Sequence, residues 1–463
     1  METLRKRIRV KTDVKEPIPL NDSLENQPLS PVARMFHEPD SNVYIIAIIG
    51  GKTKINPEVV KERLPHTLLR HPRFSSLQVN LDDHVIVPEL DPNSIDSPDK
   101  FVEDYVSNLS KNRIKMSMPM WDLHLLNLKT SDAESVGVFR IHHSLGDGAS
   151  LMSLFLASTQ KVSNPEELPT LPLFKKVNFS NSCGGFWGKL IKLWLVMSLF
   201  WNTLVDVVMF LATAFKLLGD TKTPLKGTLG TGSNPRRIVH RSVCFDDIKL
   251  VRNAMGSVRK SNKIDEGSSE RSNNLPNNIC LRATFFINIR PIPGIPELAD
   301  MMKKGTKAKW GNEIGYLIYP FTIGLRDNPL DYLREAKATM DRKKKSLEAL
   351  FSYFFAKYFL KFCGMKLASF PSQTTLWFSN MPGPQEEISF YGHPVAYLAP
   401  SCYGQPNGLM IHVVGYANKM TFVLSVDDGI IPDPHQLCDD LEESLRIIKS
   451  AVTTEGLVKK DVN

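Results

Sequence analysis

IHHSLGDGAS, residues 141–150, lies between a predicted strand and a predicted helix. Residues 136–141 alternate like a half-buried strand, and residues 149–159 carry apolar side chains at helical spacing. We therefore place His142 and His143 on a strand-to-helix loop. An imidazole there can take a proton from a hydroxyl, because its ordinary pKa of about 6.5 is close to neutral pH. The stretch is a candidate catalytic loop.

The other residues of this stretch suit a loop that is held in place. Asp147 can cap the following helix or pair with an arginine, and Gly146 and Gly148 allow a tight backbone and close approach of a substrate. The alternative is an ordinary capped helix preceded by two polar histidines. Because Asp and Gly accompany the histidine pair at fixed spacing, we favour catalysis, with His143, His142 and Asp147 as site residues.

A second predicted strand supplies a partner for Asp147. Residues 283–290, ATFFINIR, read as a strand that ends in an arginine, Arg290. A guanidinium at that position can pair with the Asp147 carboxylate and fix the loop. The alternative is a hydrated arginine at a strand end.

Length and composition limit the class of protein. A chain of 463 residues exceeds one ordinary core, so we expect two domains or a pseudo-symmetric pair. The formal charge of +8 suits an anionic surface, but no Arg-rich or aromatic-interleaved tract indicates nucleic acid, so membrane lipid is the expected partner. Six scattered cysteines without metal-ligand spacing indicate reduced thiols facing the cytosol, and no metal. The charged first 15 residues lack the apolar core of a secretory signal.

Strands and helices alternate irregularly along the chain, which indicates a mixed α/β fold. We divide it into a first half at residues 1–180 with the histidine loop, a linker with a hydrophobic helix at residues 181–225, and a second half at residues 226–463. Residues 257–278 of the second half are polar with little to bury, and we predict a loop there.

Residues 186–218 are the most hydrophobic segment and are long enough to cross a bilayer. Four polar residues, Ser198, Asn202, Asp206 and Thr213, fall on one narrow helical stripe, and an Asp at mid-helix costs at least about 2.5 kcal/mol in lipid. Flanking lysines and three tryptophans favour the headgroup level. We predict a helix that lies in the membrane interface, with a buried core helix as the alternative.

Three residues outside the histidine pair are expected to line the substrate site: Gly148, Trp121 and Asn380. Trp121 leads the strand ahead of the histidines, and for its indole we favour core packing under the loop over direct contact with the acyl chain. Asn380 belongs to the turn SNMPGP, residues 379–384, whose side chains could hydrogen-bond a ligand or an oxyanion. His71 stands beside a proline at a helix end, and we expect it to be structural or on the surface.

HHSLGDG, residues 142–148, resembles the HHxxxDG signature of CoA-dependent acyltransferases. Flanking segments resemble the plant bifunctional wax ester synthase and diacylglycerol acyltransferase family: residues 28–36, 71–76, 118–121, 223–227, 311–315 and 379–384. The resemblance covers nearly the whole chain. It implies two chloramphenicol-acetyltransferase-like domains that form a pseudo-dimer around a central substrate tunnel. By the same resemblance, His143 has the role of base and Asp147 a structural role.

The implied reaction moves a long-chain acyl group from acyl-CoA to a long-chain alcohol or to diacylglycerol, and releases CoA. His143 would accept the hydroxyl proton and later protonate the departing thiolate. A tunnel that holds both substrates needs no acyl-enzyme, and no bound cofactor is expected. The expected location is the cytosolic face of the endoplasmic reticulum membrane, with the plasma membrane as the alternative.

One departure from the family pattern leaves a second function open. Family members continue after the residues that match 253–256 into a segment with an Asn-Asp pair, and that segment is absent here. An acyl-lipid binding protein with impaired catalysis is therefore the alternative. A third hypothesis, a soluble acyltransferase for small acceptors, conflicts with the hydrophobic helix at residues 186–218.

Overall fold

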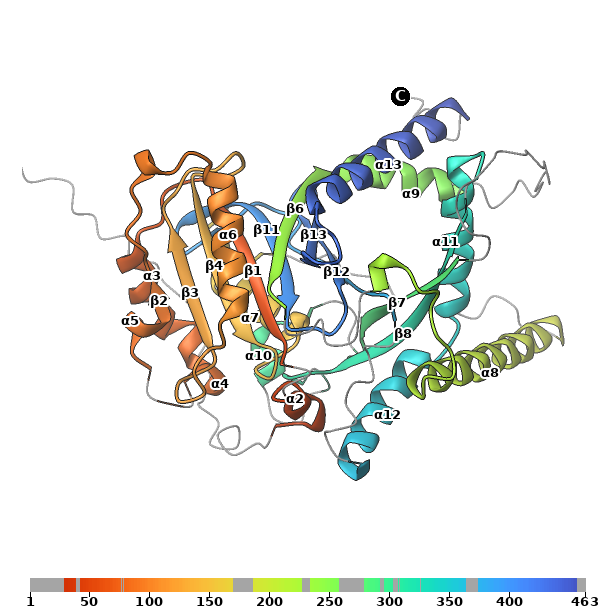
Figure 1. Cartoon of the computed structure of the whole chain (residues 1–463). Helices are drawn as coiled ribbons and strands as arrows, with labels where there is room; N and C mark the ends of the chain where they lie inside the picture. The colour runs from red at the N-terminus through yellow and green to blue at the C-terminus, as the bar shows by residue number, and fades with distance from the viewer. Residues whose placement is uncertain are drawn as a thin grey trace, which may run out of the picture.

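Two mixed β-sheets form the centre of the molecule in the computed structural model (Figure 1). The structure describes residues 29–38, 42–75, 77, 79–169, 186–226, 234–257, 279–291, 295–302, 307, 309–324, 326–363 and 374–455. Most of the predicted linker before residue 186 and nearly all of the predicted polar loop at residues 257–278 lie outside these ranges. The expected mixed α/β class is confirmed.

The first sheet carries the histidines. Its strand order is β2-β3-β4-β1-β11-β10-β5, and within the described residues only β2 and β3 pair in parallel. The strands are β1 (Tyr44–Gly51), β2 (Val85–Ile86), β3 (Trp121–Leu126), β4 (Ser135–His142), β5 (Thr159–Lys161), β10 (Ile388–Phe390) and β11 (His393–Tyr403).

The second sheet has the order β6-β13-β12-β9-β7-β8. Strand β9 runs parallel to both of its neighbours, whereas the other pairs are antiparallel. The strands are β6 (Arg236–Cys244), β7 (Ile279–Asn288), β8 (Ile314–Ile323), β9 (Leu376–Met381), β12 (Leu409–Tyr416) and β13 (Lys419–Asp427).

Helices cover both faces of the first sheet. Val102 and Val106 of α6 pack on Ile46 and Val138 at one face, while Leu151 of α7 joins the core at the other face. The helices are α2 (Pro31–Met35), α3 (Pro57–Arg63), α4 (Pro72–Ser75), α5 (Leu81–His84), α6 (Pro98–Lys111), α7 (Gly148–Ala157), α8 (Phe186–Ala214), α9 (Phe245–Ser257), α10 (Leu298–Met302), α11 (Pro329–Lys343), α12 (Glu348–Cys363) and α13 (Pro434–Thr454).

The strand and helix predicted around the histidines are present as β4 and α7. The boundary differs at one residue, because β4 continues through His142, which pairs in register with Tyr44 of β1. His142 is therefore the last residue of the strand, and the loop begins at His143. Neighbouring residues at the end of a strand point to opposite faces, so His142 and His143 have different surroundings.

Residues from the second half of the chain complete the first sheet. Strand β11 pairs along its length with β1, from Tyr44 opposite Tyr403 to Gly51 opposite Val395. Figure 1 shows β11 beside β1, although more than 300 residues separate them along the chain. The three-part division of the chain therefore does not describe the sheets, since residues 388–403 cross from one half to the other.

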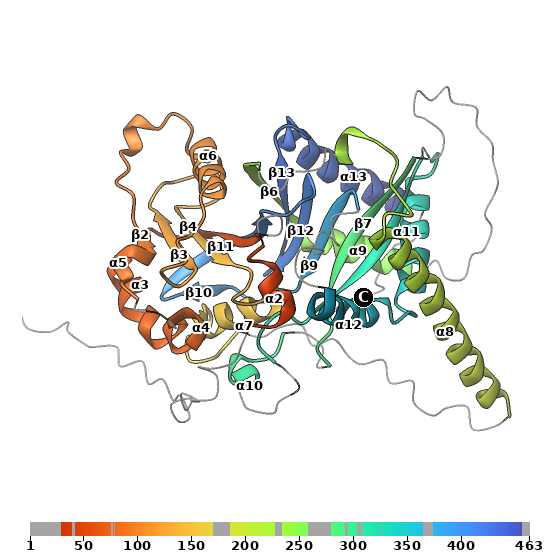
Figure 2. The same cartoon turned by 60° about the horizontal axis from the view of Figure 1, so that its bottom comes forward.

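The hydrophobic helix α8 extends away from the sheets, as Figure 2 shows. Its second half docks on the second sheet and on α12, where Phe210 contacts the rings of Phe351 and Phe355. Two residues of the predicted polar stripe, Asp206 and Thr213, are buried at this contact. Asp206 is buried and pairs with Lys343 at 2.9 Å and with Arg342 at 2.8 Å. These two ion pairs thus compensate the charge of Asp206 within the apolar helix.

The outward face of α8 is mainly apolar instead, with Lys189 and Lys192 as exposed charges. Only 11% of its most hydrophobic window is buried in the protein, and length and composition would let the helix cross a membrane. Its exposed side chains include Trp187, Trp194 and Trp201.

Replacement of Asp206 by Asn should loosen the attachment of α8. Lys343 is buried between Asp206 and Glu348, so the variant leaves this ammonium with one carboxylate. We expect the free energy of unfolding to fall by about 1–3 kcal/mol, measured by urea unfolding of the full chain in detergent. Asp331→Asn is the control, because its exposed pair with Arg334 should contribute less than about 1 kcal/mol. Equal stability of the two variants would contradict a stabilising role for Asp206.

Candidate active site

A cavity lies between the two sheets, walled by α2, β1, β4, α7 and β11 on one side and by β7, β8, β9 and β12 on the other. Its empty volume is about 1180 Å³, part of it open to solvent. The lining is mainly apolar. Its lining residues with polar side chains include His143, Ser379, Ser401 and His412. The cavity therefore suits a long apolar ligand with one reactive polar group.

His143 enters the cavity wall in a defined orientation. Its Nδ1 lies 3.0 Å from Oδ1 of Asn312, and Nδ2 of Asn312 donates to the main-chain carbonyl of His143 at 3.1 Å. A carbonyl only accepts, so the Asn312 amide nitrogen must face it and the amide oxygen must face the ring. Nδ1 therefore carries the hydrogen, and Nε2 keeps the lone pair of a base. The imidazole also stacks on Phe36, with the ring centroids 4.2 Å apart.

The surroundings of His143 keep it neutral. Burial lowers the pKa of the imidazole, and the negative charge of Asp147 and the Asn312 hydrogen bond oppose this effect only in part. A neutral ring at neutral pH can accept a proton, whereas an imidazolium could not. His143 therefore has the orientation and the protonation state of a general base.

His142 does not share the predicted catalytic position. It is fully buried, outside the cavity lining, and both ring nitrogens are occupied. Nε2 donates to the carbonyl of Phe36 at 3.0 Å, and Nδ1 lies 2.7 Å from the Ser144 hydroxyl. Burial lowers the pKa of His142 to about 3, so the ring stays neutral. This is a correction: His142 anchors Phe36, which stacks on His143, and contributes no base.

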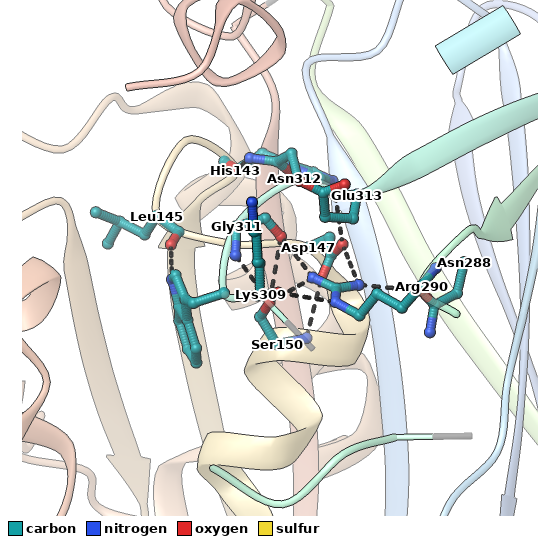
Figure 3. A network of polar contacts seen from close by, with 11 residues as sticks. His143, Leu145, Asp147, Ser150, Asn288, Arg290, Lys309, Gly311, Asn312 and Glu313 are labelled. Atoms are coloured by element: carbon teal, nitrogen blue, oxygen red, sulfur yellow. Dashed lines mark hydrogen bonds and ion pairs between the residues drawn. The ribbon is translucent and has the colours of Figure 1, made fainter. Parts of the chain in front are cut away.

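Asp147 and Arg290 connect the two halves behind the histidine (Figure 3). Arg290 donates to the carboxylate twice, at 2.8 and 3.1 Å, and both side chains are almost fully buried. Asp147 caps α7 by accepting from the main-chain N–H of Ser150 at 2.9 Å, and it accepts from the N–H of Glu313 at 3.0 Å. Asp147 lies outside the cavity lining. Its geometry therefore supports a positioning role.

A second set of contacts holds the loop from beneath. The indole of Trp310 donates to the Leu145 carbonyl at 2.7 Å, and Arg73 donates to the Ser144 and Leu145 carbonyls at 3.3 Å. His71, which we expected to be structural, is buried against Trp310, with ring centroids 3.9 Å apart. Because connecting segments of the second half contact residues 143–147, the geometry of the loop depends on contact between the two halves.

Of the three residues expected to line the substrate site, Gly148 does so. A Cβ on Gly148 would lie 2.4 Å from the Met381 sulfur, so a larger residue here would require the flexible Met381 side chain to move. Trp121 lies outside the lining: its indole is fully buried, stacks on His84 and donates to the Phe74 carbonyl at 3.1 Å. The favoured role of Trp121, core packing, is confirmed, and its candidacy as a lining residue was wrong.

Asn380 also requires a correction. Side chains alternate along a strand, and on β9 the cavity receives Trp377, Ser379 and Met381. Asn380 lies between the last two and therefore projects to the opposite side, where it is exposed.

Asn312 and Trp310 are the residues that sequence reasoning missed. The signal available was WGN, residues 310–312, a polar amide that follows a glycine directly before a strand. Gly311 has φ of 126°, a conformation that favours glycine and turns both side chains toward the histidine loop. In the part of the chain that the structure describes, no cluster of three His, Cys, Asp or Glu residues is arranged to hold a metal.

Comparison with known proteins gives a consistent assignment. The model of the WS/DGAT C-terminal domain family matches residues 310–449. Wax ester synthase/diacylglycerol acyltransferase 11 of Arabidopsis thaliana is 45% identical, over 95% of this chain and 98% of its own. Wax ester synthase/diacylglycerol acyltransferase 5 of the same plant is 46% identical, over 92% and 94%.

Solved structures agree on the fold. The wax ester synthase/diacylglycerol acyltransferase from Marinobacter aquaeolei VT8 matches with a TM-score of 0.52 at 15% identity, over 92% of this chain and 100% of that chain. A mutant starter condensation domain of rhizomide synthetase RzmA, in complex with C8-CoA and Leu-SNAC, matches with a TM-score of 0.50 at 12% identity, over 92% and 94%. These likenesses confirm the expected fold of two chloramphenicol-acetyltransferase-like parts.

Replacement of Asn312 by Asp should move the pH dependence of activity. In the native protein the pKa of His143 is below its ordinary value of 6.5, so the acid limb of the kcat/KM profile should have its midpoint below pH 6.5. A carboxylate at position 312 stabilises the imidazolium and raises this pKa. As the pH decreases, activity should therefore begin to fall at a higher pH than in the native protein. Asn108→Asp, remote from the cavity, is the control. An unchanged midpoint in Asn312→Asp would show that Asn312 does not hold the base.

Proposed function

The chain belongs to the wax ester synthase/diacylglycerol acyltransferase family, and we propose that His143 is the base with which it transfers a long-chain acyl group to a fatty alcohol or to diacylglycerol. It is an acyl-CoA-dependent O-acyltransferase. One observation carries the role of His143: its imidazole lines a large apolar cavity while Asn312 holds Nδ1 and leaves Nε2 free to accept a proton.

The reaction needs one base and two positioned substrates. The acceptor hydroxyl attacks the thioester carbonyl while its proton passes to Nε2 of His143. The tetrahedral intermediate then collapses, the carbon–sulfur bond breaks, and the CoA thiolate takes the proton from His143. No net proton is consumed. Because the cavity adjoins both sheets, it can hold both substrates beside one imidazole. Orientation of the two substrates then accounts for much of the rate enhancement.

The apolar cavity favours lipid substrates over small ones. A small polar acceptor would leave most of the apolar lining without contact, which argues against a soluble acyltransferase of small acceptors. The impaired binding protein is not favoured either. The relatives named above match over more than nine-tenths of this chain, and Asp147, Arg290, Asn312 and His143 are in contact as a base and its supports require.

We further propose that the protein meets the cytosolic face of the endoplasmic reticulum membrane through α8 and α12. Apart from Lys189 and Lys192, the exposed side chains of α8 are mainly apolar, with tryptophans along the first half of the helix, and such residues partition into the lipid interface. Helix α12 contacts α8 and adds exposed Leu350, Phe354, Tyr358 and Phe362. Because α12 also contacts α2, which lines the cavity, this face would bring lipid acceptors and diacylglycerol close to His143.

Replacement of His143 by Gln should abolish ester formation. A general base contributes about 10²–10⁴-fold, and no other group in the loop has a free nitrogen facing the cavity. The assay offers labelled palmitoyl-CoA with hexadecanol or with diacylglycerol to the purified full chain. His66→Gln, an exposed histidine, is the control. Ester formation by His143→Gln at the native rate would overturn the assignment of the base.

Replacement of Trp194 by Glu should weaken membrane binding. The indole is exposed on the free half of α8, so the carboxylate should reduce binding to phosphatidylcholine–phosphatidylserine vesicles several-fold, measured by flotation of the full chain. Met116→Glu is the matched control, because Met116 is as exposed but lies before β3, in the first half. If both variants bind like the native protein, α8 is not the membrane contact.

A further inference from the structure

We propose that His412 is a further catalytic residue, which donates a hydrogen bond from Nε2 to the thioester oxygen as negative charge develops on it. This inference rests on the proposed acyl transfer and concerns the same cavity. Sequence reasoning singled out no residue near position 412, which lies in the middle of strand β12.

The sheets bring His412 to the cavity together with two serines. Strand β12 runs parallel to β9, with His412 in register with Ser379, and both side chains line the cavity. Ser401 of β11 also lines it, and its hydroxyl lies 3.3 Å from Nδ1 of His412. This polar cluster therefore combines a residue of the first sheet with two of the second, in a wall that is otherwise mainly apolar.

The contact with Ser401 defines what His412 can do. When the Ser401 hydroxyl donates to Nδ1, the ring hydrogen resides on Nε2, the nitrogen left for a ligand. Burial, and then repulsion from His143 when that ring carries a proton, lower the pKa of His412 to about 3, so it stays neutral throughout the working range. A neutral imidazole is a poor base at this pKa but remains a hydrogen-bond donor. His412 is thus suited to stabilise charge rather than to move a proton.

The reaction needs such a donor. When the acceptor oxygen bonds to the carbonyl carbon, the carbonyl π electrons move to oxygen, and the hydroxyl proton passes to His143. The resulting oxyanion would be unsolvated among apolar side chains. A hydrogen bond from Nε2 of His412 stabilises it until the carbonyl re-forms, the carbon–sulfur bond breaks and the thiolate takes the proton from His143. Donors of this kind typically contribute about 10²–10³-fold to kcat.

Two substitutions at position 412 separate the donor from the volume of the ring. His412→Phe keeps an aromatic side chain without a donor, and we expect kcat to fall about 100-fold with little change in KM for palmitoyl-CoA. His412→Gln keeps an N–H and should recover at least about tenfold of this loss. Ser401→Ala should lower kcat by about fivefold, because the tautomer is no longer fixed. The acid limb of the pH profile should persist in every variant, since His143 is intact.

The control is His240→Phe, which replaces a histidine that packs against Tyr397 outside the cavity and should leave activity unchanged. Thermal melting of each variant checks folding. The inference is overturned if folded His412→Phe keeps kcat within threefold of the native value, if the loss is confined to KM, or if His412→Gln is no better than His412→Phe. A native protein that forms no ester would instead reject the proposed function, and this inference with it.

Discussion

The buried ion pair of Asp147 and Arg290 is the contact on which the site depends. It joins the loop after β4 to the end of β7, and Asp147 also receives main-chain hydrogen bonds from α7 and from Glu313. In water this pair would contribute little, but both groups are almost fully excluded from solvent. Removal of either partner would leave an uncompensated buried charge, which typically costs about 3–5 kcal/mol. The pair therefore enforces one arrangement of the two halves.

Three buried histidines share one protonation state but have different functions. Burial lowers the pKa of His142, His143 and His412, so all three rings are neutral. What distinguishes them is which nitrogen is already bonded. His142 uses both, and serves as an anchor for Phe36. His143 has Nδ1 engaged by an acceptor, which leaves a lone pair, whereas the partner of His412 is a hydroxyl, which can leave a hydrogen on Nε2.

Packing contacts also link the hydrophobic helices α8 and α12 to the surroundings of His143. Asp206 and Phe210 attach α8 to α11 and α12, and α12 packs on α2, whose Met35 lines the cavity beside Phe36. A shift of α8 or α12 would thus reach the ring that stacks on His143 through few contacts. A long apolar helix with a charged residue at its middle is stable here because the charge is paired inside the protein.

Local sequence patterns determined the parts of this protein that depend on neighbours along the chain. Alternation and helical spacing predicted β4 and α7, the capping position identified Asp147, and the motif selected His143. The polar stripe of α8 was visible as well, but not the surface that it would face. Each of these features is set by backbone periodicity and by residues within a few positions.

Only the tertiary structure decided which polar groups meet. His143 and Asn312 are 169 positions apart, and Asp147 and Arg290 are 143 apart, so no spacing rule could place the amide or show that the guanidinium is buried. Strand register likewise turned Ser379 into the cavity and Asn380 away from it, and core packing removed Trp121 from the site. Side-chain direction at a site built between two sheets depends on how the sheets pair and pack, and that is a property of the whole chain.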